Sequence, residues 1–231
     1  MRIRVVPAAL AAVCGLACGP ALRAATVLTP LNASFELGSL VGWTSAGDVS
    51  TQTLGVCVQP QMPSEGLVAA CLSTESLFGG MAVGGVRSEL ESPPVTPSFR
   101  PKSLTVTFDF DYGTDETPRS IGFDDLISVT LLTGAGPYPI LIGDTWGTTP
   151  NGSGLAVTGS PGLTFPTPGC DQQVFLQTGR INVKWKRFLS VPEQNAIQNA
   201  PIVVQFTVAD RGDASRLTFL CLDNLGIKAS H

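Results

Sequence analysis

Strict alternation of apolar and polar side chains is the feature of this sequence that most limits its fold. Residues 104–112 run L-T-V-T-F-D-F-D-Y, with an apolar side chain at every second position and a polar or small one between. Because successive side chains of a strand point to opposite faces, the pattern predicts a strand with one buried and one wet face. The same period recurs at 127–131, 181–186 and 204–208.

Turn-forming residues separate these stretches, at Pro93-Pro94, at 134–137 (G-A-G-P) and through 148–162. The region 143–169, rich in Gly, Thr, Ser and Pro, predicts a long surface loop. Many short strands with such punctuation are typical of a β-sandwich or jelly roll.

One short helix is expected, over residues 190–197. Ser190 and Glu193 have the spacing of a capping box, and Pro192 suits a first helical turn. We therefore predict an all-β protein, a β-sandwich or jelly roll with at most one short helix.

The N-terminus has the layout of a secretory signal peptide. A short basic start is followed by an apolar stretch at 5–16 and then by small residues, which predicts a signal peptide over 1–24. The apolar stretch is shorter than the roughly 20 residues of a membrane-spanning helix. Cleavage after Ala24 or Ala25 would leave residues 25–231 as one sandwich domain, secreted to the extracellular space or the periplasm.

The charge balance limits the partners. Residues 25–231 keep all 18 acidic residues but only 11 of the 14 basic ones, for a formal charge of −7. This acidity argues against nucleic acid and anionic membrane surfaces. A second long apolar segment is missing from the sequence, so we expect no membrane insertion after cleavage. Lipidation at Cys18 is a second-ranked alternative, because no large apolar side chain stands three positions upstream.

Four cysteines, an even number, remain in the predicted exported domain, which favours two disulfides. Three pairings are possible. The favoured one is Cys57–Cys71 with Cys170–Cys221, because the first two flank a predicted turn. A zinc site competes, but the sequence has no C-x-x-C pair in this part and its only histidine is the terminal His231.

Three segments resemble the galactose-binding-like jelly rolls, which include several families of carbohydrate-binding modules and many exported bacterial proteins. Residues 32–43 (N-A-S-F-E-L-G-S-L-V-G-W) resemble the opening motif N-G-S-F-E-x-G-x-x-x-G-W, with Ala33 in place of the usual glycine. Residues 63–73 are similar to the strand that follows in such domains, and 219–227 to the closing strand with its D-N pair. The resemblance spans nearly all of 25–231.

A second resemblance concerns the middle of the chain. Residues 108–116 and 123–129 are similar to a block of exported bacterial proteins that carry a C-terminal sorting tail of the PEP-CTERM type. The sequence ends at 228–231 (K-A-S-H) without such a tail. We therefore expect release rather than anchoring by that route.

The jelly-roll resemblance implies a structural calcium ion held by Glu36 and Asp223. Calcium takes about 6–8 oxygen ligands, and carboxylates from the two chain ends would pin the sandwich shut. The alternative is that Glu36 accepts hydrogen bonds from turn amides and that Asp223 caps a strand end. A weaker candidate metal site comprises the acids on either side of a loop, for which solvation is the favoured interpretation: Asp115, Glu116, Asp124 and Asp125. Solvation is also expected for Asp109 and Asp111, on the wet face of their strand.

Sugar binding would need an exposed flat ring. Trp43 belongs to the opening motif and Trp185 to an alternating strand, so both are predicted in the core. Trp146, in the polar loop 143–148, is the candidate binding ring, and a tryptophan folded back over the sandwich is the alternative.

The leading hypothesis is a secreted, non-catalytic jelly-roll module that binds an extracellular polysaccharide and is stabilised by calcium. The second is a structural or adhesive cell-surface protein without a small-molecule site. A secreted glycoside hydrolase ranks third: carboxylates are plentiful, but nothing in the sequence indicates a cleft or one acid held protonated. A histidine for a triad and a G-x-S-x-G nucleophile elbow are both missing.

Overall fold

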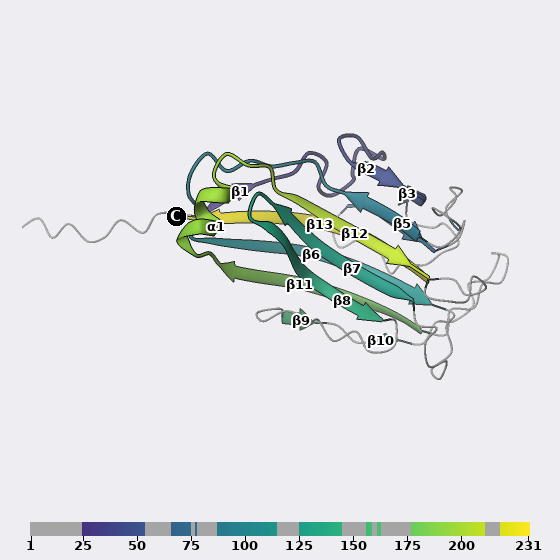
Figure 1. Cartoon of the computed structure of the whole chain (residues 1–231). Coiled ribbons are helices and arrows are strands. Elements are labelled where there is room, and N and C mark those ends of the chain that lie inside the picture. Colours follow the sequence, from purple (N-terminus) through teal and green to yellow (C-terminus); the bar gives the residue numbers. More distant parts are fainter. Residues whose placement is uncertain are drawn as a thin grey trace, which may run out of the picture.

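Two antiparallel sheets face each other across an apolar core (Figure 1). The computed structural model describes residues 25–53, 66–74, 77, 87–114, 125–144, 156–158, 161–162, 177–210 and 218–231. Sheet A has the strand order β10 (Pro161–Gly162), β11 (Gln177–Phe188), β6 (Ser103–Thr114), β13 (Thr218–Ser230), β4 (Val68–Ser73) and β3 (Asp48–Thr53). Two short strands extend it, β1 (Thr26–Leu28) beside β13 and β9 (Ala156–Thr158) beside β11. Sheet B has the order β2 (Thr44–Ala46), β5 (Arg87–Glu91), β12 (Val203–Ala209), β7 (Leu126–Thr133) and β8 (Gly136–Asp144). The prediction of a β-sandwich is confirmed.

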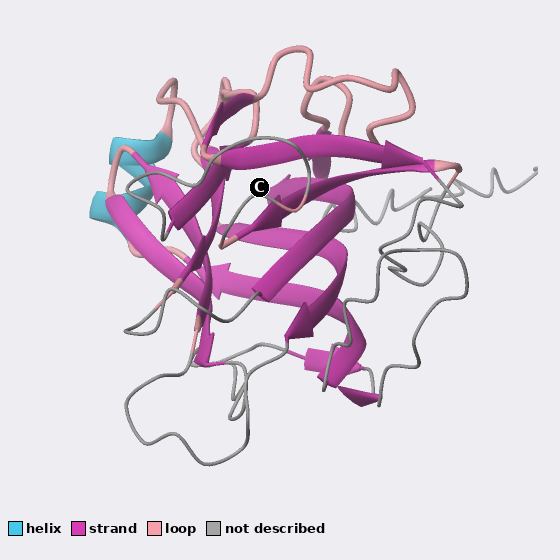
Figure 2. Cartoon of the chain, turned by 90° about the vertical axis from the view of Figure 1, so that its right-hand side faces the viewer, coloured by secondary structure: helices cyan, strands magenta, loops and turns pink. Residues whose placement is uncertain are grey.

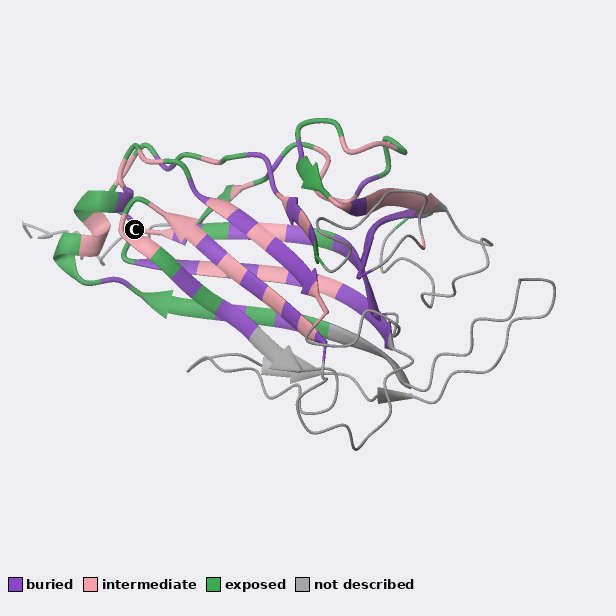
Figure 3. Cartoon of the chain, turned by 45° about the vertical axis from the view of Figure 1, so that its right-hand side comes forward, coloured by how far each residue is buried: buried purple, intermediate pink, exposed green. Residues whose placement is uncertain are grey.

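The alternating stretches form the strands that were predicted. In β6 the side chains at 104, 106, 108, 110 and 112 are buried in the core, whereas Thr105, Thr107 and Asp109 on the other face are partly exposed. The same alternation runs along β7 and most of β12 (Figure 3). The period of two therefore sets which face of each strand lies between the sheets.

Residues 134–137 were predicted as a break, and the structure corrects this. The turn occupies 134–135, and β8 begins at Gly136 and includes Pro137 and Pro139. Proline lacks an N–H group, but β8 is an edge strand of sheet B and pairs on one side, with β7, where proline is tolerated. Of the predicted loop 143–169, the structure describes the end of β8, β9 and β10, and the remainder lies outside the described residues.

The predicted helix is present as α1 (Val191–Ile197), which follows β11 directly (Figure 2). Ser190 is its N-cap, and the carboxylate of Glu193 accepts the Ser190 backbone N–H at 2.7 Å. The same carboxylate accepts the Tyr138 hydroxyl at 2.9 Å and pairs with Arg187 at 2.8 Å. Glu193 thus joins α1 to β8 and β11. Within the described residues, no helix is long and apolar enough to cross a membrane.

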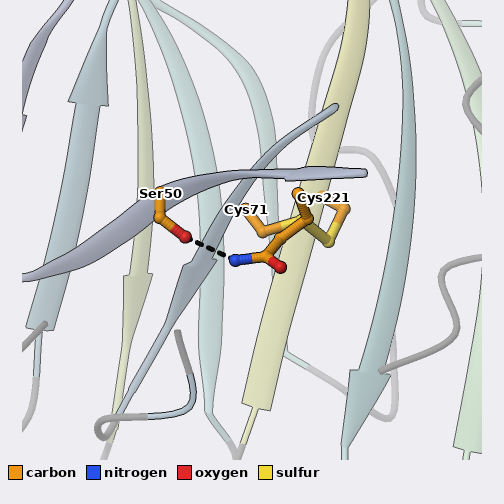
Figure 4. Close-up of a disulfide and its surroundings, with 4 residues drawn as sticks. Ser50, Cys71 and Cys221 are labelled. Carbon is orange, nitrogen blue, oxygen red and sulfur yellow. Dashed lines mark hydrogen bonds between the residues drawn. A yellow bond between two sulfur atoms is a disulfide. The ribbon is translucent and has the colours of Figure 1, made fainter. Parts of the chain in front are cut away.

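The structure corrects both favoured disulfide pairs. Cys71 of β4 is bonded to Cys221 of β13, with their Cα atoms 4.0 Å apart (Figure 4). The two residues stand directly opposite each other on neighbouring strands, which brings together residues 150 positions apart in sequence. The prediction was wrong because it weighed closeness in sequence, whereas strand register decides which side chains meet. Cys57 and Cys170 lie outside the described residues.

Stability is expected to depend on the ionisation of Glu193. The hydrogen bond from Arg187, followed by those from Ser190, lowers the pKa of Glu193 from 4.5 to about 2. A carboxylate with a depressed pKa in the folded state contributes stability above pH 4.5, and this contribution is lost as the pH falls from 4.5 towards 2. In thermal melts at a series of pH values, Glu193→Gln should be less stable than the wild type at neutral pH and should lose less stability across this interval. Equal losses in the two proteins would contradict this role.

Candidate functional site

The opening segment forms a loop tied down by Trp43. The indole N–H of Trp43 lies within hydrogen-bonding distance of the carbonyl oxygens of Leu31 (3.1 Å) and Asn32 (3.2 Å), and its ring packs on Phe35 at 4.6 Å. Asn32 and Phe35 both have positive φ, so the loop turns sharply around the indole. The prediction that Trp43 belongs to the core is confirmed, and so is that for Trp185.

Glu36, on this loop, is hydrogen-bonded to the start of β4. Its Oε1 atom accepts the backbone N–H groups of Leu67 (3.0 Å) and Val68 (3.1 Å). Gly66 is required beside it, because a Cβ atom there would stand 2.1 Å from the Glu36 carboxyl carbon and φ is +68°. These contacts are the turn-amide hydrogen bonds that formed the alternative to a calcium ligand.

Asp223, the second predicted calcium ligand, is buried on β13, and its Oδ1 atom accepts the Asn224 N–H at 2.7 Å. Just beyond it, the Leu225 N–H donates to the Ala33 carbonyl of the opening loop at 3.1 Å. The opening and closing segments therefore meet at one corner of the sandwich, which we call the Glu36 corner.

The donor set of the Glu36 corner fits a cation only in part. Oε1 of Glu36 already accepts two N–H groups and Oδ1 of Asp223 accepts the Asn224 N–H, so both predicted carboxylate ligands already take part in hydrogen bonds. In the part of the chain that the structure describes, no group of three or more His, Cys, Asp or Glu side chains forms a metal site. Calcium takes about 6–8 oxygens, so backbone carbonyls would supply most of them.

The acids proposed as a weaker metal site are only partly placed. Solvation, the favoured interpretation, is wrong for Asp125, which is fully buried just before β7. Asp115, Glu116 and Asp124 lie outside the described residues. The expectation of solvation is wrong for Asp111, which points to the outer face of sheet A but is only 6% exposed. Asp109 is partly exposed and accepts a hydrogen bond from the side chain of Asn182 on β11.

The aromatic side chains leave one exposed ring among the described residues. The tryptophans and tyrosines described are all buried, namely Trp43, Tyr112, Tyr138 and Trp185. Trp146, the predicted binding ring, lies outside the described residues. The exposed ring is Phe188, at the end of β11 next to α1, with 75% of its surface accessible.

Phe188 belongs to an exposed surface on sheet A, which we call the basic strip. On β11, Lys184 and Lys186 share its face because they precede it by four and two residues. Lys186 stands opposite Thr105 of β6, and Thr105 stands opposite Lys228 of β13. The basic strip comprises Lys184, Lys186, Phe188, Thr105, Thr107 and Lys228. All three lysines are exposed, and the two threonines between them are partly exposed.

The remainder of this outer face differs in character. Beside the disulfide it is apolar and buried, formed by Ala69, Cys71, Phe219 and Cys221. Between that cluster and the basic strip lie three acids, Asp109, Asp111 and Asp223. The basic strip is therefore one bounded end of the sheet face, where polar groups reach solvent.

Sequence reasoning missed the basic strip. Its signal lay in the period of two, since Lys184 and Lys186 fall on the polar phase of the predicted strand and Phe188 continues that phase. The contribution of Lys228 depends on β13 pairing with β6, which the sequence pattern does not specify.

A comparison with solved structures finds several that are similar to this chain. The chain is similar to the K1 cleaved adhesin domain of Lys-gingipain from Porphyromonas gingivalis, with 13% identity, a TM-score of 0.46 and coverage of 86% of this chain and 96% of that one. It is also similar to the CBM22-1 xylan-binding domain from Paenibacillus barcinonensis Xyn10C, with 13% identity, a TM-score of 0.37 and coverage of 90% and 96%. A third is the C-terminal family 22 carbohydrate-binding module of Clostridium thermocellum Xyn10B, with 11% identity, a TM-score of 0.31 and coverage of 87% and 97%.

These solved structures are two carbohydrate-binding modules and an adhesin domain. No protein-family profile and no curated protein sequence matches the chain.

Proposed function

We propose that this chain is an exported, non-catalytic β-sandwich module that binds a glycan on the basic strip. The observation that carries the proposal is the exposed ring of Phe188 in line with hydroxyl and ammonium groups on three adjacent strands. A sugar ring has an apolar face, which packs on an aromatic side chain, and an edge of hydroxyls, which need hydrogen-bonding partners.

The strip supplies both kinds of contact on a rigid base. The strand register places Phe188 opposite Ser103 of β6. The Ser103 hydroxyl lies 2.6 Å from that of Ser230 on β13. The ammonium group of Lys186 lies over the Phe188 ring, 4.7 Å from its centroid. This contact orients the ring while leaving its accessible surface to a ligand.

Replacing the exposed ring should weaken glycan binding. Phe188→Ala is expected to lower affinity about three- to tenfold, because the stacking contact is lost while the sheet is unchanged. Affinity electrophoresis through gels that contain single polysaccharides measures this. The matched control is Leu37→Ala, since Leu37 is also largely exposed (64%) but lies on the opening loop. If no polysaccharide retards the wild type, the alternative of a structural or adhesive protein without a glycan site is favoured.

Export is part of the proposal, and the Cys71–Cys221 disulfide supports it. Such bonds persist in oxidising compartments and are rare in the cytosol. Mass spectrometry of protein recovered from outside the cytoplasm of a bacterial host should find an N-terminus at Ala25 or Thr26. Non-reducing peptide maps of the same sample should link Cys71 to Cys221. An intact Met1 end, or both cysteines free, would contradict export.

We also propose a structural calcium ion at the Glu36 corner, with Glu36 and Asp223 as its carboxylate ligands. A hundredfold excess of calcium over its Kd should raise the Tm by about 5–10 °C, because the ion binds only the folded state. Glu36→Gln keeps an oxygen that can accept the Leu67 and Val68 N–H groups but removes the negative charge. The shift should therefore disappear in this variant. An unchanged wild-type Tm on adding calcium or chelator would refute the proposal.

A further inference from the structure

We infer that the glycan recognised by the basic strip is anionic, a polysaccharide that carries carboxylate or sulfate groups. The inference rests on the proposed function and names the substrate class of the same site. Three of the four lysines in the whole sequence lie on this strip, although residues 25–231 carry a formal charge of −7.

Among the described residues, no carboxylate forms an ion pair with the lysines of the strip. Where arginines meet carboxylates in the described residues, as in Arg87 with Glu89 and Arg187 with Glu193, the charges are paired. Lys184 and Lys228 have no carboxylate within 4.0 Å among the described residues, and Lys186 contacts the Phe188 ring. Exposed cations of this kind are available to an external anion, and the strip is where the described surface offers three together.

The spacing of the lysines suits an extended polymer with separated charges. Lys184 and Lys186 are two residues apart on one strand, so their Cα atoms are about 7 Å apart. Lys186 and Lys228 share a row across β11, β6 and β13, so their Cα atoms are about 10 Å apart. Thr105 and Thr107 lie between the lysines and offer hydroxyls to the sugar units between charged groups.

The surroundings favour a polysaccharide over other polyanions. Duplex DNA carries one charge per about 1.7 Å, and a long run of it would meet Asp109, the partly exposed acid that borders the strip. Asp109 and Asp223 stand opposite each other one row beyond Thr107, and Asp111 follows Asp109 on the same face of β6. An anionic membrane that covers the sheet face would likewise meet Asp109, the partly exposed acid of the three. A narrow chain with widely spaced charges can follow the strip and avoid that acid.

The test compares charged and neutral polymers on matched variants. Polygalacturonate, heparin, neutral xylan, duplex DNA and phosphatidylserine vesicles serve as probes for wild type, the triple variant K184Q/K186Q/K228Q and the control R87Q. The triple variant should bind polygalacturonate or heparin about tenfold more weakly or worse, since three exposed ion pairs are lost, whereas R87Q should bind as the wild type. Added salt should weaken wild-type binding more steeply than that of the triple variant.

The other outcomes distinguish failure of the anionic class from failure of the glycan site. If the wild type binds xylan as tightly as the acidic polymers and the triple variant retains that binding, the anionic class is wrong, and Phe188→Ala still tests the glycan site. Tighter lysine-dependent binding to DNA or to vesicles than to either acidic polysaccharide overturns the inference in favour of that polyanion. Failure to bind both acidic polysaccharides overturns it as well. Thermal melts check that the triple variant is folded, as expected for substitutions at exposed positions.

Discussion

The pairing of the last strand with the middle of its sheet is the interaction on which the structure depends. β13 pairs with β6 through eleven residue pairs. Its other edge pairs first with β4 and, further along β13, with β1, where Thr26 stands opposite Ala229. The Cys71–Cys221 bond fixes the β4 pairing covalently. Because β13 is the last strand and these partners come from the N-terminal half of the sequence, this part of sheet A forms only when the two ends of the domain meet.

One irregularity in that strand determines what each part of the sheet face presents. The β13–β6 register shifts between Asp223 and Gly226, where Asn224 has positive φ and Leu225 bonds to the opening loop. Before the shift, β13 contributes Cys221 and Asp223 to the outer face; after it, Lys228 and Ser230. The bulge thus divides the face into a disulfide-linked, acidic part and a basic part, and it places the Glu36 corner at the boundary.

The sequence predicted which face of each strand is buried better than it predicted which strands lie side by side. A period of two predicted which side chains of β6, β7, β11 and β12 are buried, because burial of one face is a local requirement of a half-buried strand. It did not predict the Cys71–Cys221 pair, which depends on register between strands far apart in sequence. It also misplaced the start of β8, since proline excludes a central strand but not an edge. Predicting the basic strip would have required both the period of two and the register between strands.

The position of each aromatic side chain in the fold explains why the exposed ring is Phe188, which lies outside the segments that resemble the jelly-roll family. Trp43 and Trp185 belong to positions that the fold itself requires, one closing the opening loop and one facing sheet B, so neither ring reaches a ligand. Phe188 ends its strand beyond the core-facing residues, where burial asks for no aromatic side chain. An exposed apolar ring at such a position costs solvation without adding to the core. A ligand that covers the ring would remove that cost, and the proposed negative charge of the ligand would complement the lysines beside it.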